Sequence, residues 1–307
     1  MYSGWVIKWR VNRNVSEEEY ASGLLMKPLE GACSDDKGTL TAFNSTYVEF
    51  VDRRFRLRGG FGTMIATVWF LFSLFFIFFA WLGLPHQEFD EIIGVIVISS
   101  VSLLSGFISW YVLPRLDFFN CTNYPVRFNR RTRMVYVYRS SRDGGILAIP
   151  WGEGFFHVGK GLRNKYLLDL RCHVLDDNMV SDTFVVGAYF DDETIIRNLW
   201  TFICKYMDEG PDAVRPRHLM ISTKPTWKNC YIFIAGNMRL YSSMKRFLFA
   251  PVLLLFAGFR WLVMVTCRPP VWPQVIEDAC RIDEIDPNRL PEPDYIGQFS
   301  READAIR

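Results

Sequence analysis

Two long stretches without a charged residue constrain this chain more than any other feature of its sequence. They run from Phe61 to Leu84 and from Ile92 to Leu113, and the acidic loop Pro85 to Glu91 separates them. At 1.5 Å per residue, a helix over either stretch is long enough to cross a bilayer core of roughly 30 Å. The sequence therefore predicts a transmembrane helical hairpin over residues 61–113.

The distribution of arginines predicts how this hairpin is oriented. Basic residues near the ends of a span resist translocation. Four arginines precede the first stretch and five follow the second, namely Arg53, Arg54, Arg56, Arg58, Arg115, Arg127, Arg130, Arg131 and Arg133. The loop between the stretches has three acidic residues and no Lys or Arg. We therefore expect a multi-pass protein with its N-terminus and its main domain on the cytoplasmic side.

The second apolar stretch carries small residues at spacings of three and four. These residues are Ser99, Ser102, Gly106 and Ser109. A stripe of this kind lets a neighbouring helix approach closely, and its hydroxyls can bond across the interface. It predicts packing within the hairpin, with homo-oligomerisation or a lipid-facing role as alternatives. Because neither stretch has an ionisable residue, a conducting pore is disfavoured.

Residue counts and spacings exclude several classes of function. With a formal net charge of +2, the chain lacks the overall excess of basic residues that is typical of nucleic-acid-binding proteins. The seven cysteines form no C-x-x-C pair, and the four histidines lack the spacing of a metal motif. The run Gly154 to Gly161 follows the spacing of a phosphate-binding loop but ends in Gly where Ser or Thr would hold magnesium, so we interpret its glycines as a hairpin turn. We predict a non-enzymatic protein without cofactor, metal or nucleic-acid partner.

Residues 124–210 have the pattern of a small domain. Short strand-like runs alternate with polar turns up to Tyr189, which predicts an antiparallel meander that Thr46 to Val51 can extend. Acidic residues at 191–193 and Gly210 mark the ends of an amphipathic helix. Antiparallel strands capped by one helix resemble the pleckstrin-homology-like domains of bacterial membrane proteins. The predicted fold class is therefore α+β, with a transmembrane hairpin and a cytosolic domain of this kind.

A cluster of arginines after the second stretch gives a candidate lipid site. Anionic headgroups attract basic side chains near a membrane by about 1 kcal/mol each. The candidate contacts are Arg127, Arg130, Arg131 and Arg133. The alternative is that these residues only fix the topology of the hairpin.

A third apolar stretch, Phe247 to Cys267, is interrupted by Pro251 and the central Arg260. We favour a broken or interfacial helix packed on the hairpin over a third span. The Pro-rich run from Arg268 to Pro273 predicts an extended linker, and residues 286–307 a weakly ordered polar end. The expected organisation is a strand-contributing segment at 1–60, the hairpin at 61–113, a β-rich domain at 114–245 with its helix at 191–210, the membrane-associated stretch at 246–267, and the linker, short helix and tail at 268–307.

Four further runs share a pattern, namely Ile149 to Trp151, Phe184 to Gly187, Leu199 to Pro211 and Pro270 to Pro273. Together they resemble an uncharacterised family of bacterial two-helix membrane proteins associated with type VI secretion loci. The resemblance implies a bacterial inner-membrane protein that acts as an immunity or accessory protein, with membrane lipids and a cognate toxin or secretion component as partners. A membrane-active secreted effector and a lipid-sensing scaffold are the alternatives.

Overall fold

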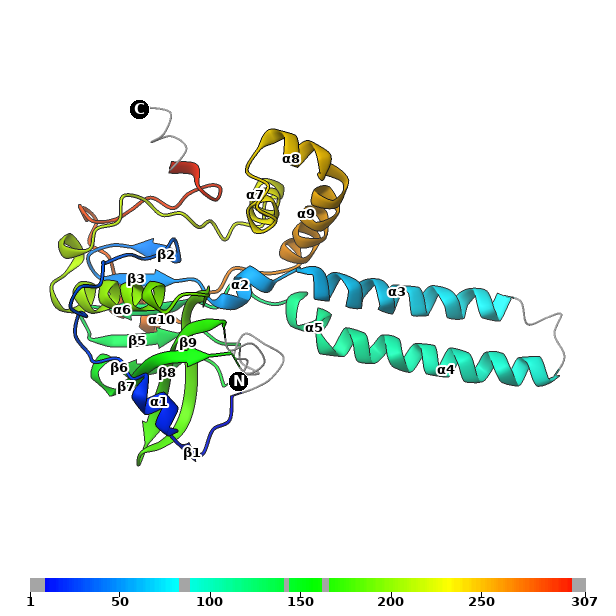
Figure 1. Cartoon of the computed structure of the whole chain (residues 1–307), viewed down its shortest axis with the longest axis horizontal. Helices are drawn as coiled ribbons and strands as arrows, with labels where there is room; N and C mark the ends of the chain where they lie inside the picture. The colour runs from blue at the N-terminus through cyan, green and yellow to red at the C-terminus, as the bar shows by residue number, and fades with distance from the viewer. Residues whose placement is uncertain (1–8, 83–88, 141–143, 162–165, 300–307) are drawn as a thin grey trace. The chain divides into compact units, whose positions relative to one another are not determined.

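The computed structural model describes residues 9–82, 89–140, 144–161 and 166–299, and it divides the chain into two compact units (Figure 1). Residues 1–56, 121–224 and 269–307 form one of them, here called the sheet unit. Residues 57–120 and 225–268 form the other, the helical unit. The chain passes from the sheet unit to the helical unit near the end of α2 (Arg53–Leu57) and returns before β4 (Val126–Asn129). Residues 225–268 then form the second part of the helical unit.

The sheet unit contains two antiparallel sheets. The first has the order β2-β3-β4-β5-β6, with β2 at Leu40–Phe43, β3 at Tyr47–Phe50, β5 at Met134–Val137 and β6 at Leu147–Pro150. The second has the order β1-β9-β8-β7, with β1 at Arg13–Asn14, β7 at Gly154–Lys160, β8 at Leu168–Asp176 and β9 at Met179–Phe190. A tight turn through Asp177 and Asn178, both with positive φ, joins β8 to β9 where the polar turn is expected. The mixed α+β prediction is confirmed.

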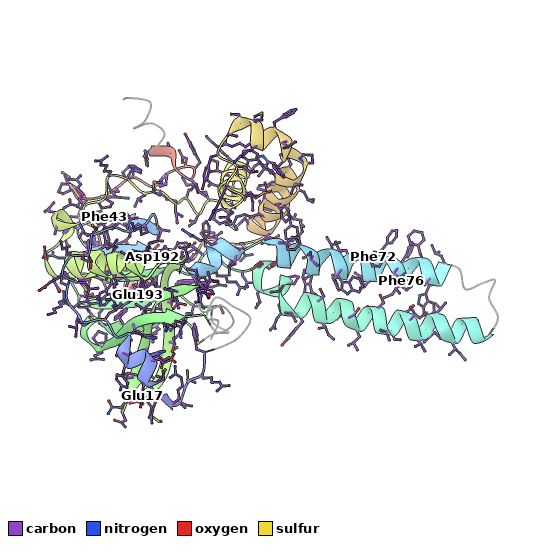
Figure 2. All side chains as sticks on the ribbon, in the orientation of Figure 1. Glu17, Phe43, Phe72, Phe76, Asp192 and Glu193 are labelled. Atoms are coloured by element: carbon purple, nitrogen blue, oxygen red, sulfur yellow. The ribbon has the colours of Figure 1, made fainter. Side chains whose placement is uncertain are left out.

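The amphipathic helix is present as α6 (Glu193–Asp208). The side chain of Asp192, labelled beside Glu193 in Figure 2, accepts a hydrogen bond of 2.8 Å from the Thr194 amide and so caps the first turn. The apolar face of α6 shares one core with residues of both sheets. At its centre the fully buried Trp200 packs against Phe156 at a ring distance of 4.6 Å. Burial of this face, rather than helix propensity, therefore holds α6 in place.

Our interpretation of Gly154 to Gly161 as a hairpin turn is wrong. Residues 154–160 form β7, whose Phe156 and Val158 point into the core while Phe155 and His157 lie on its other face. A Cβ at Gly159 would lie 2.3 Å from Oδ1 of Asp169 on the neighbouring strand. Glycine is thus required here by close approach between strands and not by a turn.

Two helices of the helical unit are long and apolar enough to cross a membrane. They are α3 (Phe61–Leu82) and α4 (Phe89–Val112), and the apolar helical stretch of the second continues to Asp117 through α5 (Pro114–Asp117). Figure 1 shows α3 and α4 running side by side. Residues 83–88, between these helices in the sequence, lie outside the described residues. In the most apolar 18-residue segment of each helix, only 17% is buried within the chain for the first and 11% for the second.

The small-residue stripe of α4 meets α3. The Ser109 hydroxyl donates a hydrogen bond of 2.9 Å to the Ala66 carbonyl, and a Cβ at Gly106 would lie 2.9 Å from the Ser73 side chain. Ser99 is buried and Ser102 half-buried. Close packing in the hairpin thus depends on the absence of a side chain at residue 106.

Replacing this glycine tests the packing. Gly106→Leu is expected to destabilise the hairpin by about 1–3 kcal/mol, because overpacking forces the two helices apart. Gly94→Leu on the same helix is the matched control, since a Cβ at Gly94 meets nothing within 4 Å. The measurement is thermal unfolding of both purified variants in the same detergent. Equal melting temperatures would show that α3 does not pack on this stripe.

The rest of the helical unit differs in part from the expected organisation. The third apolar stretch is broken into α8 (Ser243–Leu248) and α9 (Ala250–Val265). Pro251 lies in the first turn of α9, where its missing N–H costs nothing, so it begins this helix rather than interrupting it. The helix α7 (Trp227–Asn237) packs its Ile234 against Leu253 and Ala257 of α9. Residues 225–237 therefore belong with the apolar stretch and not with the β-rich domain.

Arg260 lies in the middle of α9 without breaking it. Its guanidinium donates to the Arg58 carbonyl and lies 3.8 Å from the centre of the Phe233 ring. The carbonyl and the aromatic ring together offset part of the cost of burying this cation in an apolar helix.

The C-terminal segment is more ordered than its composition predicts, as far as the described residues reach. After α10 (Gln274–Ala279), the Asp286 carboxylate accepts hydrogen bonds from the amide and hydroxyl of Ser45, and the Leu290 amide donates to the Phe43 carbonyl. Gly297 pairs with Met220 in the same way. Hydrogen bonds to other parts of the sheet unit hold this polar segment, although its composition predicts weak order. Residues 300–307 lie outside the described residues.

Candidate functional site

Two histidines and a glutamate of the sheet unit come together at the polar face of β7 and β8. In the strand register, His157 stands opposite Arg171, and Phe155 stands opposite His173. Because side chains alternate along a strand, His157 and His173 are diagonal neighbours on one face. Residues of the other face, such as Phe156 and Cys172, enter the core.

A short N-terminal helix, α1 (Glu17–Ala21), supplies the third member of this cluster. Ser16 caps α1 by accepting from the Glu19 amide, while the Glu19 carboxylate accepts from the Ser16 amide. Backbone hydrogen bonds on either side of Gly23 tie the following residues to β7, from the Leu24 amide to Phe156 and from the Val158 amide to Ser22. The helix is thereby fixed above the two imidazoles.

The polar atoms of the cluster are within hydrogen-bond distance. His157 Nε2 lies 3.0 Å from His173 Nε2, which in turn lies 3.1 Å from Glu19 Oε1. Nδ1 of His173 lies 2.8 Å from the Thr183 hydroxyl, and two nitrogens of Arg13 hold the Glu19 carboxylate at 2.6 and 2.7 Å. We name these three residues, Glu19, His157 and His173, the His–His–Glu cluster.

Burial and charge set the protonation of the His–His–Glu cluster. Burial lowers the pKa of His157 to about 3, and the neighbouring His173 and Arg171 act in the same direction. Burial also lowers the pKa of His173, although the Glu19 carboxylate opposes this shift. Burial alone would raise the pKa of Glu19, but its hydrogen bonds, with Arg13 foremost, hold that pKa below the usual range. At neutral pH two neutral imidazoles therefore face a carboxylate.

A second polar group shares this face of the sheet. The fully buried Asp169 accepts from Arg53 at 2.6 Å and from Arg171 at 3.0 Å. The guanidinium of Arg171 lies 3.8 Å from the centre of the Trp9 ring, and that of Arg53 lies 4.4 Å from the centre of the Tyr189 ring. We name Arg53, Asp169 and Arg171 the buried ion cluster. We interpret it as a structural group, because the Asp169 carboxylate is buried and is engaged by both guanidinium groups.

The arginines named as candidate lipid contacts are engaged with the sheet unit itself. Arg127 is buried, with 5% of its side chain exposed. It pairs with Glu49 at 2.9 Å and with Glu277 at 3.4 Å. Arg131 pairs with Asp283, and Arg133 with Asp208 at 3.0 Å, both half-exposed. The guanidinium of Arg130 lies against Gly210. Lipid contact therefore stays a prediction for all four arginines, and Arg127 would have to leave its acidic partners to make it.

Replacing Arg127 separates the two roles. Arg127→Gln is expected to lower the free energy of unfolding by about 1.5–3 kcal/mol, because it leaves Glu49 without its charged partner. The measurement is urea unfolding of the full chain in detergent. Arg131→Gln is the control, with a loss below about 1 kcal/mol, since its pair is exposed. A normal unfolding curve combined with weaker binding to anionic vesicles would instead favour the lipid role.

Comparison with known proteins places most of these residues in one family. The family of unknown function DUF6708 matches residues 105–284. This chain belongs to the DUF6708 family. No curated protein and no solved structure matches it significantly.

The DUF6708 match includes β7, β8 and α6, but it begins after α3 and most of α4. His157 and His173 lie inside the matched region, whereas Glu19 lies outside it. The expectation that this is an uncharacterised family is confirmed.

Sequence reasoning missed the His–His–Glu cluster for a specific reason. The histidines are 16 positions apart, which is no metal motif, and only a strand over 154–160 brings them onto one face. The signal for that strand is weak, because Phe155, Phe156 and Val158 are all apolar and only His157 interrupts the run. The glycines at either end obscured it.

Proposed function

We propose that this chain is a membrane-anchored binding protein, in which α3 and α4 span a bacterial inner membrane and the sheet unit binds a partner in the cytoplasm. The observation that carries the proposal is the exposure of large apolar side chains along both helices. Phe72 and Phe76 of α3, labelled in Figure 2, are 53% and 38% exposed, and Ile108 of α4 is 56% exposed. Water does not tolerate a continuous apolar surface of this length on a monomer, whereas lipid does.

A second apolar surface supports membrane attachment. On α8, Phe247 and Leu248 are 85% and 72% exposed, and on α9 Leu255 is 60% exposed. At 16 residues, α9 is about 24 Å long, short of a bilayer core. Lys245 and Arg246 of α8 supply the charge that anionic headgroups attract. We therefore assign α8 and α9 to the membrane interface rather than to a third span.

The role we propose for the sheet unit is binding rather than catalysis. Both histidines of the His–His–Glu cluster are 1% exposed, which leaves a substrate no access to their ring nitrogens. The two sheets capped by α6 support a binding module of the pleckstrin-homology-like kind. The resemblance to proteins of type VI secretion loci supports an immunity or accessory role, with a cognate toxin or secretion component as the partner.

Coexpression tests this role. The chain is expressed in a bacterium with and without the product of the gene beside its own, and growth and membrane potential are followed. Rescue of cells that the neighbouring product poisons is the expected result. The anchor is tested in the same assay by Phe72→Arg, which is expected to abolish rescue, with Phe72→Leu as the matched control. Absence of rescue by the wild-type chain contradicts the immunity role, and loss of membrane potential caused by the chain alone would identify a membrane-active effector.

A further inference from the structure

The arrangement of Glu19, His157 and His173 points to a metal site in the sheet unit. The ligand atoms of these three residues all lie within 4.8 Å of one another. Two ligands on a tetrahedral zinc ion, each about 2.0–2.1 Å from the metal, lie roughly 3.3 Å apart. The two observed separations of 3.0 and 3.1 Å are close to this value. We propose that the His–His–Glu cluster binds one divalent transition-metal ion, Zn²⁺ for preference.

With both imidazoles neutral, the hydrogen bonds of the cluster cannot all be satisfied at once. If Nδ1 of His173 carries its proton and donates to Thr183, then its Nε2 is a lone pair that faces the carboxylate oxygen of Glu19. If Nε2 carries the proton instead, one proton must serve both Glu19 and the Nε2 of His157. Nδ1 of His157 is buried and has no hydrogen-bond partner among the described residues, so it does not relieve the conflict. A cation at the centre accepts all three lone pairs.

The surroundings of the cluster resemble the supporting shell of a metal site. Thr183 is placed to accept the Nδ1 proton of His173, which would direct the Nε2 lone pair of this histidine toward the metal. The Phe155 ring stacks on both imidazoles at 5.6 and 6.3 Å and shields them from water. Arg13 fixes the Glu19 carboxylate. The Glu19 side chain is 16% exposed, so the carboxylate is the part of the cluster nearest to solvent.

The proposed ion would link three elements. Glu19 comes from α1, His157 from β7 and His173 from β8. The chain between α1 and β7 is long, so one ion would close a loop of more than a hundred residues and stabilise the N-terminal segment against the sheet. Burial of both histidines suits such a structural role.

Metal titration of the full chain in detergent tests the proposal. The protein is first treated with a chelator, and Zn²⁺ or Co²⁺ alone is then added. The expected results are binding of one ion per chain, the visible absorption of four-coordinate Co²⁺, and a higher melting temperature with Zn²⁺. Failure of the wild-type chain to bind either ion stoichiometrically would overturn the proposal, and this result requires no variant.

Variants identify the ligands. Glu19→Gln and His173→Gln are expected to abolish stoichiometric binding. Thr183→Val keeps the shape of its side chain and is expected to weaken Zn²⁺ binding by about 10–100-fold, as loss of a supporting hydrogen bond does. His218→Gln, which alters a histidine beside Met220 outside the cluster, is the control and should bind as the wild type does. Circular dichroism checks that each variant is folded. Wild-type affinity in folded Glu19→Gln and Thr183→Val would assign the binding to another place and overturn the proposal.

Discussion

Asp169→Ala is expected to lower the free energy of unfolding of the sheet unit by about 3–5 kcal/mol. The Asp169 side chain is fully buried and is the carboxylate shared by Arg53 and Arg171. Both guanidinium groups are themselves buried, at 2% and 6% exposure of their side chains. Removing the acid leaves two cations inside the protein without the charge that offsets their desolvation. The aromatic rings of Trp9 and Tyr189 beside them compensate only in part.

Urea unfolding of the full chain in detergent, followed by tryptophan fluorescence, measures this loss. Trp151 and Trp200 lie in the core of the sheet unit and report on its unfolding. Asp283→Ala removes the acid of another arginine pair, but one whose side chains are 45% and 62% exposed. Its expected cost is below about 1 kcal/mol. Equal losses in the two variants would show that Asp169 does not hold a buried network.

Phe72→Arg is expected to disfavour insertion of the hairpin by about 3 kcal/mol, since insertion scales assign such a cost to arginine at the centre of a span. Phe72 lies near the middle of the 22-residue helix α3. Phe61→Arg, at the first residue of the same helix, is the matched control. Both phenylalanines are exposed, at 53% and 61%. In a membrane the two arginine substitutions differ in cost, because an arginine at the end of a span reaches the interface and one at the centre does not.

The fraction of each variant that resists alkaline extraction from membranes measures insertion. A lower fraction for Phe72→Arg together with a nearly unchanged fraction for Phe61→Arg is the expected result. In water the two exposed positions would be equivalent. Equal behaviour of both variants would therefore contradict a membrane-spanning α3 and, with it, the anchor on which the proposed function rests.

Local patterns were sufficient for several elements of the fold. Apolar length alone predicts α3 and α4. The periodic apolar residues between Asp192 and Gly210 predict α6, and alternation with polar turns predicts most strands from β4 to β9. In each case the signal lies in neighbouring residues, because burial of one helical face or one strand face depends on their spacing. The strand β7 was missed because its glycines imitate a turn, whereas Gly159 is required by the proximity of Asp169 on the next strand.

Local periodicity and length are enough to predict the two candidate spans, the α+β class and the positions of most elements. Which distant residues meet depends instead on the tertiary structure. It brought Glu19 onto His157 and His173, paired Arg127 with Glu49 and Glu277, and placed Arg260 on the Arg58 carbonyl. The physical reason is that strand register and packing of distant segments fix these contacts, and neither quantity is encoded in the spacing of the residues along the chain.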